Sequence, residues 1–121
     1  MKIPTHAAVW FEIPVTDMQR STAFYAAVLG NELKLEEGGP NPMAMFAAGN
    51  EKSVSGHIYP GKPAVAGSGP TIHLSVEAPL EAAMERVSRN GGTVVSPVIT
   101  IPVGSFAYCL DPDGNSFGLF V

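Results

Sequence analysis

Residues 7–31, AAVWFEIPVTDMQRSTAFYAAVLGN, predict a strand followed directly by a helix. Residues 7–15 are rich in β-branched and aromatic side chains, which favour an extended strand. Thr16 or Asp17 can then cap a helix whose apolar residues recur at i, i+4, and Gly30 supplies the left-handed residue that ends it. This strand–helix unit decides the fold, because the same order recurs later in the chain.

The rest of the chain repeats this plan once. Three short strands are expected within residues 33–59, separated by Gly, Pro and Asn clusters, and GKPAVAGSGP at 61–70 predicts a connector. The second half predicts a strand at 71–76, a helix at 78–92 that stops at Gly91, and strands at 93–98, 105–110 and 116–121. An offset of 61 residues superimposes the halves and pairs Trp10 with Thr71, Glu12 with His73, Val15 with Val76 and Gly30 with Gly91. We therefore expect two duplicated βαβββ modules that pack against each other.

Length and composition limit the number of domains and the classes of partner. The chain has 121 residues, enough for one domain over residues 1–121, with a first module at about 1–60 and a second at about 71–121. A net charge of −4 without a basic cluster argues against nucleic acid as a partner. No apolar run reaches the length of a membrane span and no leader pattern is present, so a cytoplasmic protein without a membrane partner is expected. Cys109 lies in a strand-like run and is interpreted as a small buried hydrophobe.

Two motifs connect this plan to a known group. VTDMQRSTAFYAAVLG at 15–30 resembles the helix signature of the glyoxalase/bleomycin-resistance/extradiol-dioxygenase group, the vicinal oxygen chelate superfamily. LDPDGNSFGLF at 110–120 resembles the closing D-P-D-G-N motif of the same group. The resemblance implies an α+β fold in which eight strands of two βαβββ modules form an incomplete barrel around a cavity. It also implies a homodimer.

In metal-using members of this superfamily, each module provides one ligand from its first strand and one from its last. The resemblance places Trp10, Thr71, Gly118 and Gly56 at these positions. Two of these residues lack side chains, an indole nitrogen only donates, and a lone hydroxyl is a poor ligand for Zn²⁺ or Fe²⁺. We therefore expect neither a metal nor another cofactor, as in a glyoxalase-like branch without the metal site.

Strand alternation selects candidate site residues. If Trp10 faces the cavity then so does Glu12, and if Thr71 does then so do His73 and Ser75. Glu12 and His73 are equivalent under the duplication, so they are expected to be catalytic partners in which the carboxylate orients the imidazole. The alternative is a buried polar pair without a ligand.

Further residues are expected to line or avoid the cavity. Phe106 and Tyr108 share a strand face and join Trp10, Thr71 and Ser75 as expected ligand-binding residues. Met45 and Phe120 are interpreted as core residues. His57 is expected to touch a helix or solvent, because it lies on the strand face opposite Gly56.

Besides a structural or regulatory module that keeps the fold, three functions remain open at this point. The first is metal-independent binding of a small organic molecule in the cavity. The second is a metal-independent lyase or isomerase in which His73 and Glu12 transfer a proton on a carbonyl substrate. The third is a metal-dependent lyase or dioxygenase with unusual ligands.

Overall fold

The computed structural model describes residues 2–50 and 52–121, which form two βαβ-containing modules around one shared core. The first module contains β1 (Trp10–Val15), α1 (Met18–Leu29), β2 (Lys34–Glu36), β3 (Met43–Met45) and β4 (Ser55–Pro60). The second contains β5 (Ile72–Ser75), α2 (Leu80–Arg89), β6 (Thr93–Val94), β7 (Ile99–Ile101), β8 (Gly104–Leu110) and β9 (Ser116–Phe120). The predicted α+β class and both helices are confirmed.

Each module forms its own sheet. The first sheet has the strand order β1-β4-β3-β2, and the second has the order β5-β9-β8-β6, with β7 also pairing β8. In both sheets the first strand pairs in parallel with the last strand, and the other pairs are antiparallel. Within the described residues no strand of one sheet pairs with a strand of the other, so the barrel of a single chain is incomplete.

The strand count differs from the sequence expectation. The predicted strand at 93–98 is only Thr93–Val94, and a separate strand, β7, follows it and forms a hairpin with β8. After Val94, the Tyr108 N–H of β8 donates to the Ser96 side chain at 2.8 Å and not to a backbone carbonyl, and Pro97 has no N–H with which to resume the pairing. Residues 2–50 and 52–121 thus form nine strands where eight were expected.

Local sequence explains why α1 forms where it does. The Asp17 side chain accepts a hydrogen bond from the backbone N–H of Arg20 at 3.0 Å, and Gly30 ends the helix at φ = +79°. In α2 the C-cap is Asn90, and the predicted stop Gly91 follows it at φ = +98°. Both helices therefore end beside a glycine in a left-handed conformation that disfavours other residues.

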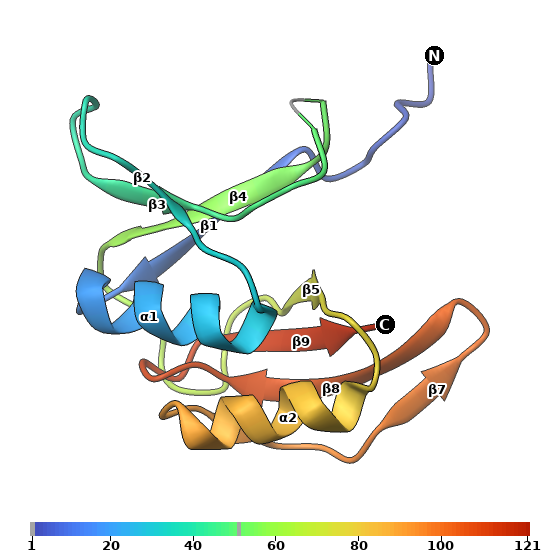
Figure 1. Cartoon of the computed structure of the whole chain (residues 1–121). Coiled ribbons are helices and arrows are strands. Elements are labelled where there is room, and N and C mark those ends of the chain that lie inside the picture. The colour runs from blue at the N-terminus through green and yellow to red at the C-terminus, as the bar shows by residue number, and fades with distance from the viewer. Residues whose placement is uncertain (1, 51) are drawn as a thin grey trace.

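The core lies between the two sheets and includes one face of each helix. In Figure 1, α1 lies between the first sheet above it and β9 below it, and α2 covers β8. Phe24 of α1 packs edge-on against Phe117 of β9, with ring centroids 5.9 Å apart. Ile13, Ile58, Leu74 and Leu119 extend the same buried cluster through both sheets, as part of a longer set. Each sheet therefore turns one face to this core and its other face, which we call the outer face, away from it.

Candidate functional site

The outer face of the first sheet carries a row of side chains fixed by strand register. Glu12 of β1 lies opposite His57 of β4, and His57 lies opposite Met45 of β3. Alternation puts Trp10 on the same face, two residues before Glu12. Met45 is absent from the buried core cluster, so its interpretation as a core residue is wrong.

Trp10, His57 and Glu12 are joined by polar contacts. The Trp10 indole Nε1–H donates to His57 Nδ1 at 2.9 Å, and His57 Nε2 lies 3.3 Å from Glu12 Oε1. His57 is 7% exposed, whereas Trp10 is 43% exposed. We call this arrangement the Trp10–His57–Glu12 line. It presents an indole and a carboxylate to the outside, with a buried imidazole between them.

The position of His57 corrects two sequence expectations. His57 does face away from Gly56, but that face is the outer face and not a helix contact. The residue opposite Glu12 is His57, and the residue opposite the equivalent His73 is Gly118. His57 is therefore the counterpart of Gly118 in the first module, and the assignment of Gly56 to that position was one residue out of register. Such a slip moves a side chain to the other face of a sheet.

Gly56 instead has a packing role on the inner face. A Cβ atom at this position would overlap the carbonyl oxygen and the ring of Phe11. A side chain at residue 56 is thus excluded by the neighbouring strand.

The outer face of the second sheet carries an aromatic cluster, defined here as His73, Phe106, Tyr108 and Phe120. The His73 ring centroid lies 5.0 Å from that of Phe106, 5.8 Å from Tyr108 and 5.9 Å from Phe120. Phe106 and Phe120 stack with an interplanar angle of 5°. Phe120 thus belongs to this cluster and not to the core, where the sequence interpretation had put it.

A glycine in β9 makes room for His73. Gly118 lies opposite His73 in the parallel β5–β9 pair, and a Cβ atom at 118 would overlap His73 Nδ1. His73 is exposed, and no other described residue donates to or accepts from its ring nitrogens. The imidazole is therefore free to bind a partner outside its own sheet.

The other expected site residues are distributed over the same sheet and its edge. Tyr108 is 36% exposed beside His73. Thr71 Oγ1 lies 2.6 Å from Ser116 Oγ, so its hydroxyl is engaged within the sheet. Ser75 is exposed on β5.

Glu12 and His73 do not meet within one chain. Glu12 approaches His57 on the first sheet, whereas His73 packs in the aromatic cluster of the second. Because the outer faces of both sheets turn away from the shared core, a single chain does not bring the two predicted partners together. The duplication makes the two positions equivalent, but equivalence does not imply contact.

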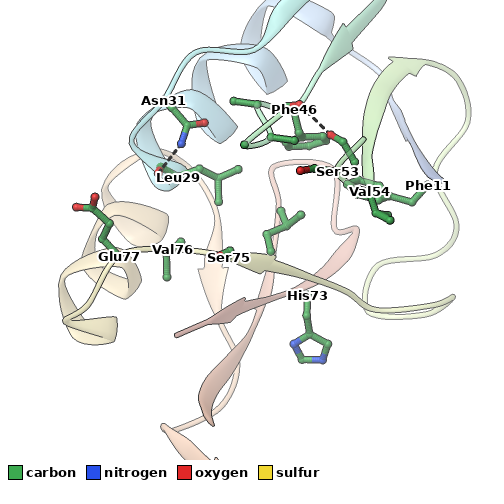
Figure 2. Close-up of a pocket in the computed structure, with 15 residues that line it drawn as sticks. Phe11, Leu29, Asn31, Phe46, Ser53, Val54, His73, Ser75, Val76 and Glu77 are labelled. Carbon is green, nitrogen blue, oxygen red and sulfur yellow. Dashed lines mark hydrogen bonds between the residues drawn. The ribbon is translucent and has the colours of Figure 1, made fainter. Parts of the chain in front are cut away.

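One cleft lies between the modules. It has a volume of about 670 Å³ and is lined by Phe46, Ser53 and Val54 of the first module and by Ser75 and Val76 of the second, among others. Figure 2 shows that the His73 ring at its border points away from these side chains. Trp10, Phe106 and Tyr108 do not line it. The cleft therefore meets the outer face of the second sheet only along β5, at His73 and Ser75, and does not reach the outer face of the first sheet at Trp10.

The donors at the superfamily's metal positions do not match a metal site. With the register corrected, these positions carry Trp10, His57, Thr71 and Gly118, and the only imidazole among them already has contacts at both nitrogens. Across residues 2–50 and 52–121, no group of three His, Cys, Asp or Glu side chains converges as metal ligands would.

Cys109 is fully buried, as the sequence suggested. Burial raises the pKa of its thiol from 9.0 to about 11, which disfavours the reactive thiolate. No helix in the described parts of the chain is long and apolar enough to cross a membrane.

Comparisons with known proteins agree with this architecture. A curated relative, a glyoxylase-like domain-containing protein of Didymella fabae, is 30% identical over 119 residues, covering 89% of this chain and 88% of the relative. A glyoxalase/bleomycin resistance protein from Albidiferax ferrireducens T118 is similar in structure, with a TM-score of 0.73, 22% identity and coverage of 95% and 98%. The fosfomycin resistance protein FosX from Mesorhizobium loti has a TM-score of 0.68, 19% identity and coverage of 98% and 93%.

Sequence identities this low to solved structures establish only the fold. The family is established by the sequence match. The family model described as Glyoxalase/Bleomycin resistance protein/Dioxygenase superfamily matches residues 6–119, which include both strand–helix units and the D-P-D-G-N turn. The chain therefore belongs to the glyoxalase/bleomycin resistance protein/dioxygenase superfamily.

Proposed function

We propose that this protein binds a small organic molecule, without a resident metal, between the outer face of the first sheet and the outer face of the second sheet of another copy. The observation that carries the proposal is the composition of these faces. Each carries aromatic rings outside the core, Trp10 on one and the aromatic cluster on the other, next to a few polar groups. Ligand sites combine apolar walls with few oriented polar groups in this way.

The proposed homodimer follows from how the faces are directed. One chain turns both outer faces away from its core, so a second copy is needed to bring a first-sheet face over a second-sheet face. A twofold axis would create two equivalent cavities, each made from both chains. In such a cavity Glu12 of one copy could lie across from His73 of the other.

The chemistry of the walls favours a planar ligand with oxygen acceptors. The Tyr108 hydroxyl and the His73 imidazole can donate hydrogen bonds, while Trp10, Phe106 and Phe120 offer ring faces and edges for stacking. Glu12 adds an acceptor for a ligand hydroxyl or amine.

A thermal-melting screen against small aromatic and carbonyl compounds, combined with light scattering, tests the proposal. A ligand that binds only the native state raises the free energy of unfolding by about 2.7 kcal/mol when its free concentration is about 100 times its Kd. We expect a dimer in solution, at least one stabilising compound, and loss of its effect in Trp10→Ala and Tyr108→Phe. Val65→Ala, at an exposed position outside both faces, is the matched control. A monomer, or hits unaffected by both site variants, would contradict the proposal.

A second function has one observation in its favour. His73 keeps both ring nitrogens free beside the Tyr108 hydroxyl, as a proton-transfer residue requires. With Glu12 of the other copy, it would make a metal-independent lyase or isomerase acting next to a carbonyl group.

Proton exchange tests this activity directly. Hydroxyketones and dicarbonyls incubated with the protein in D₂O should lose the NMR signal of the proton next to the carbonyl. His73→Gln should abolish the effect, and Glu12→Gln should weaken it. Exchange that persists in His73→Gln, or that is absent from all compounds which stabilise the protein, argues against catalysis by this residue.

A further inference from the structure

The protonation state of His57 follows from the groups around it. The Trp10 indole nitrogen can only donate, so the His57 Nδ1 atom that receives its N–H at 2.9 Å must be unprotonated. The proton of the neutral ring then lies on Nε2, which faces Glu12 Oε1 at 3.3 Å. The structure thus assigns one tautomer to His57 and leaves neither ring nitrogen free.

A second proton can enter this ring only at Nδ1. That proton would point at the indole N–H, and two donors cannot share a hydrogen bond, so Trp10 must turn away when His57 becomes charged. The hydrogen bond from Trp10 to His57 and a positive charge on the His57 ring therefore exclude each other.

Trp10 can turn away without disturbing the core. It is 43% exposed, is absent from the core cluster, and is the first residue of β1, which is an edge strand of the first sheet. Residues 2–9, which precede it, are all exposed. The indole therefore has solvent beside it and only one hydrogen bond holding it.

We infer that His57 is a positioning residue that holds Trp10 against the first sheet when neutral and releases it when protonated. The release is a property of the chain by itself. Its effect on a ligand rests on the proposed function, because Trp10 would form one wall of the proposed cavity. Acidification would then weaken binding by removing that wall.

The other charged and titratable groups around His57 are few. Tyr59 of β4 has its ring centroid 6.0 Å away, and Met45, which does not titrate, is the β3 neighbour. Farther along the same face, Lys34 and Glu36 of β2 pair with each other at 3.4 Å, and Glu32 lines a hollow beside Trp10. Glu12 is thus the charged group in contact with the imidazole.

The single tryptophan of the chain makes the release measurable by fluorescence. On acidification we expect the emission of Trp10 to shift to the red and acrylamide quenching to rise. The midpoint should equal that of the His57 ring signals in NMR.

Variants of the three histidines assign the transition. His57→Gln keeps an acceptor for the indole but does not titrate, so its emission should be independent of pH. His6→Gln and His73→Gln should retain the wild-type transition. A transition that persists in His57→Gln, or that vanishes in His73→Gln, overturns the inference.

Nitrogen NMR at about pH 8 gives an independent check that needs no acidification. We expect a proton on His57 Nε2 and none on Nδ1, and the opposite tautomer would overturn the inference. Any compound found in the melting screen should bind more weakly at the lower pH in wild type but not in His57→Gln. A fluorescence transition without any binding compound would support the inference while the proposed function fails, so the two outcomes can be told apart.

Discussion

The two modules use the same backbone plan but differ most where their first and last strands meet on the outer face. In the first module Glu12 lies opposite His57, and the two side chains approach each other. In the second module the equivalent pair is His73 and Gly118, and the missing side chain gives the imidazole room to stand out among aromatic rings. The same backbone plan thus carries two different outer faces. On the first sheet the polar side chains bond to each other, and on the second the His73 ring is exposed among aromatic rings.

Toward the core, by contrast, equivalent positions have similar roles. Tyr25 of α1 and Arg86 of α2 are 61 residues apart, and each reaches into the other module. The Tyr25 hydroxyl donates to Asp111 Oδ2 at 2.7 Å, and the Arg86 guanidinium donates to the Val28 carbonyl at 3.0 and 3.1 Å. This pair of equivalent helix positions therefore links the modules in both directions, whereas the equivalent outer-face positions differ in their contacts.

We expect the largest effect from Asp111→Ala, which is compared with Asn50→Ala in the equivalent turn of the first module. Asp111 is 3% exposed and accepts hydrogen bonds from Tyr25, from the backbone of Asp113 and from Asn115, so Asp111→Ala leaves the buried Tyr25 hydroxyl and the part-buried donors of Asp113 and Asn115 without this acceptor. We expect a loss of about 3 kcal/mol or more in the free energy of unfolding, measured by urea titration. The equivalent Asn50 makes the same turn contact to Lys52 at the surface, and Asn50→Ala should lose about 1 kcal/mol or less. Equal losses at the two sites would contradict the assigned role of Asp111.

Substitution of one glycine in the last strand of each module compares the inner face of one sheet with the outer face of the other. Gly56→Ala forces a Cβ against the backbone and ring of Phe11, and we expect it to destabilise the fold by about 2 kcal/mol. Gly118→Ala meets the exposed His73 ring, which can turn aside, so about 1 kcal/mol is expected together with a change in the His73 NMR signals. A larger loss at residue 118 than at residue 56 would reverse this comparison.

Alkaline pH tests the buried acids at the module interface. Burial, and then the Asp111 carboxylate, raise the pKa of Tyr25 well above 10.0, and burial raises the pKa of Cys109 from 9.0 to about 11. Both groups are protonated in the native state, so their contribution is complete below the unfolded-state pKa values and is lost as pH rises above them. Stability should fall above about pH 9 by about 1.4 kcal/mol per pH unit for each group.

Single substitutions separate the two groups. Cys109→Ala should remove the first part of the alkaline decrease, and Tyr25→Phe should remove the part at higher pH. If stability is unchanged up to about pH 11 in wild type, the two groups are not buried as described.

The smallest effect concerns the reciprocal contact from α2. Arg86→Met removes two hydrogen bonds from a carbonyl at the end of α1, where helix carbonyls lack internal partners, and should lower stability by about 1 kcal/mol. Arg89→Met is the matched control, because Arg89 only approaches Glu85 at 3.9 Å within its own helix. The expected loss of stability for Arg89→Met is about 0.3 kcal/mol. An equal loss for both variants would contradict a stabilising role of Arg86 between the modules.

Most of the fold could be predicted because its signals are local. The Asp17 cap, the Gly30 stop and the apolar spacing of α1 depend on neighbouring residues, and each is confirmed. β7 was missed because a three-residue strand is specified by its hairpin partner rather than by its own sequence. The short β2 and β3 were expected as longer runs for the same reason.

The candidate site was predicted less well, because it depends on register between strands far apart in sequence. His57 was put one residue out of register, although subtracting the offset of 61 from Gly118 gives residue 57 directly. Glu12 and His73 were correctly equivalent but were assigned to each other, when the actual neighbour of Glu12 comes from the last strand of its own sheet.

The sequence by itself determined the α+β class, the duplicated modules, the helix ends and the superfamily, because these follow from local pattern and from repetition. Only the tertiary structure decided that His57 joins Trp10 to Glu12, and that Gly118 leaves room for His73. It also decided that one chain turns its two outer faces away from a shared core. Parallel pairing of the first and last strand of each module brings together residues that are about 45 positions apart, and no local rule fixes that register.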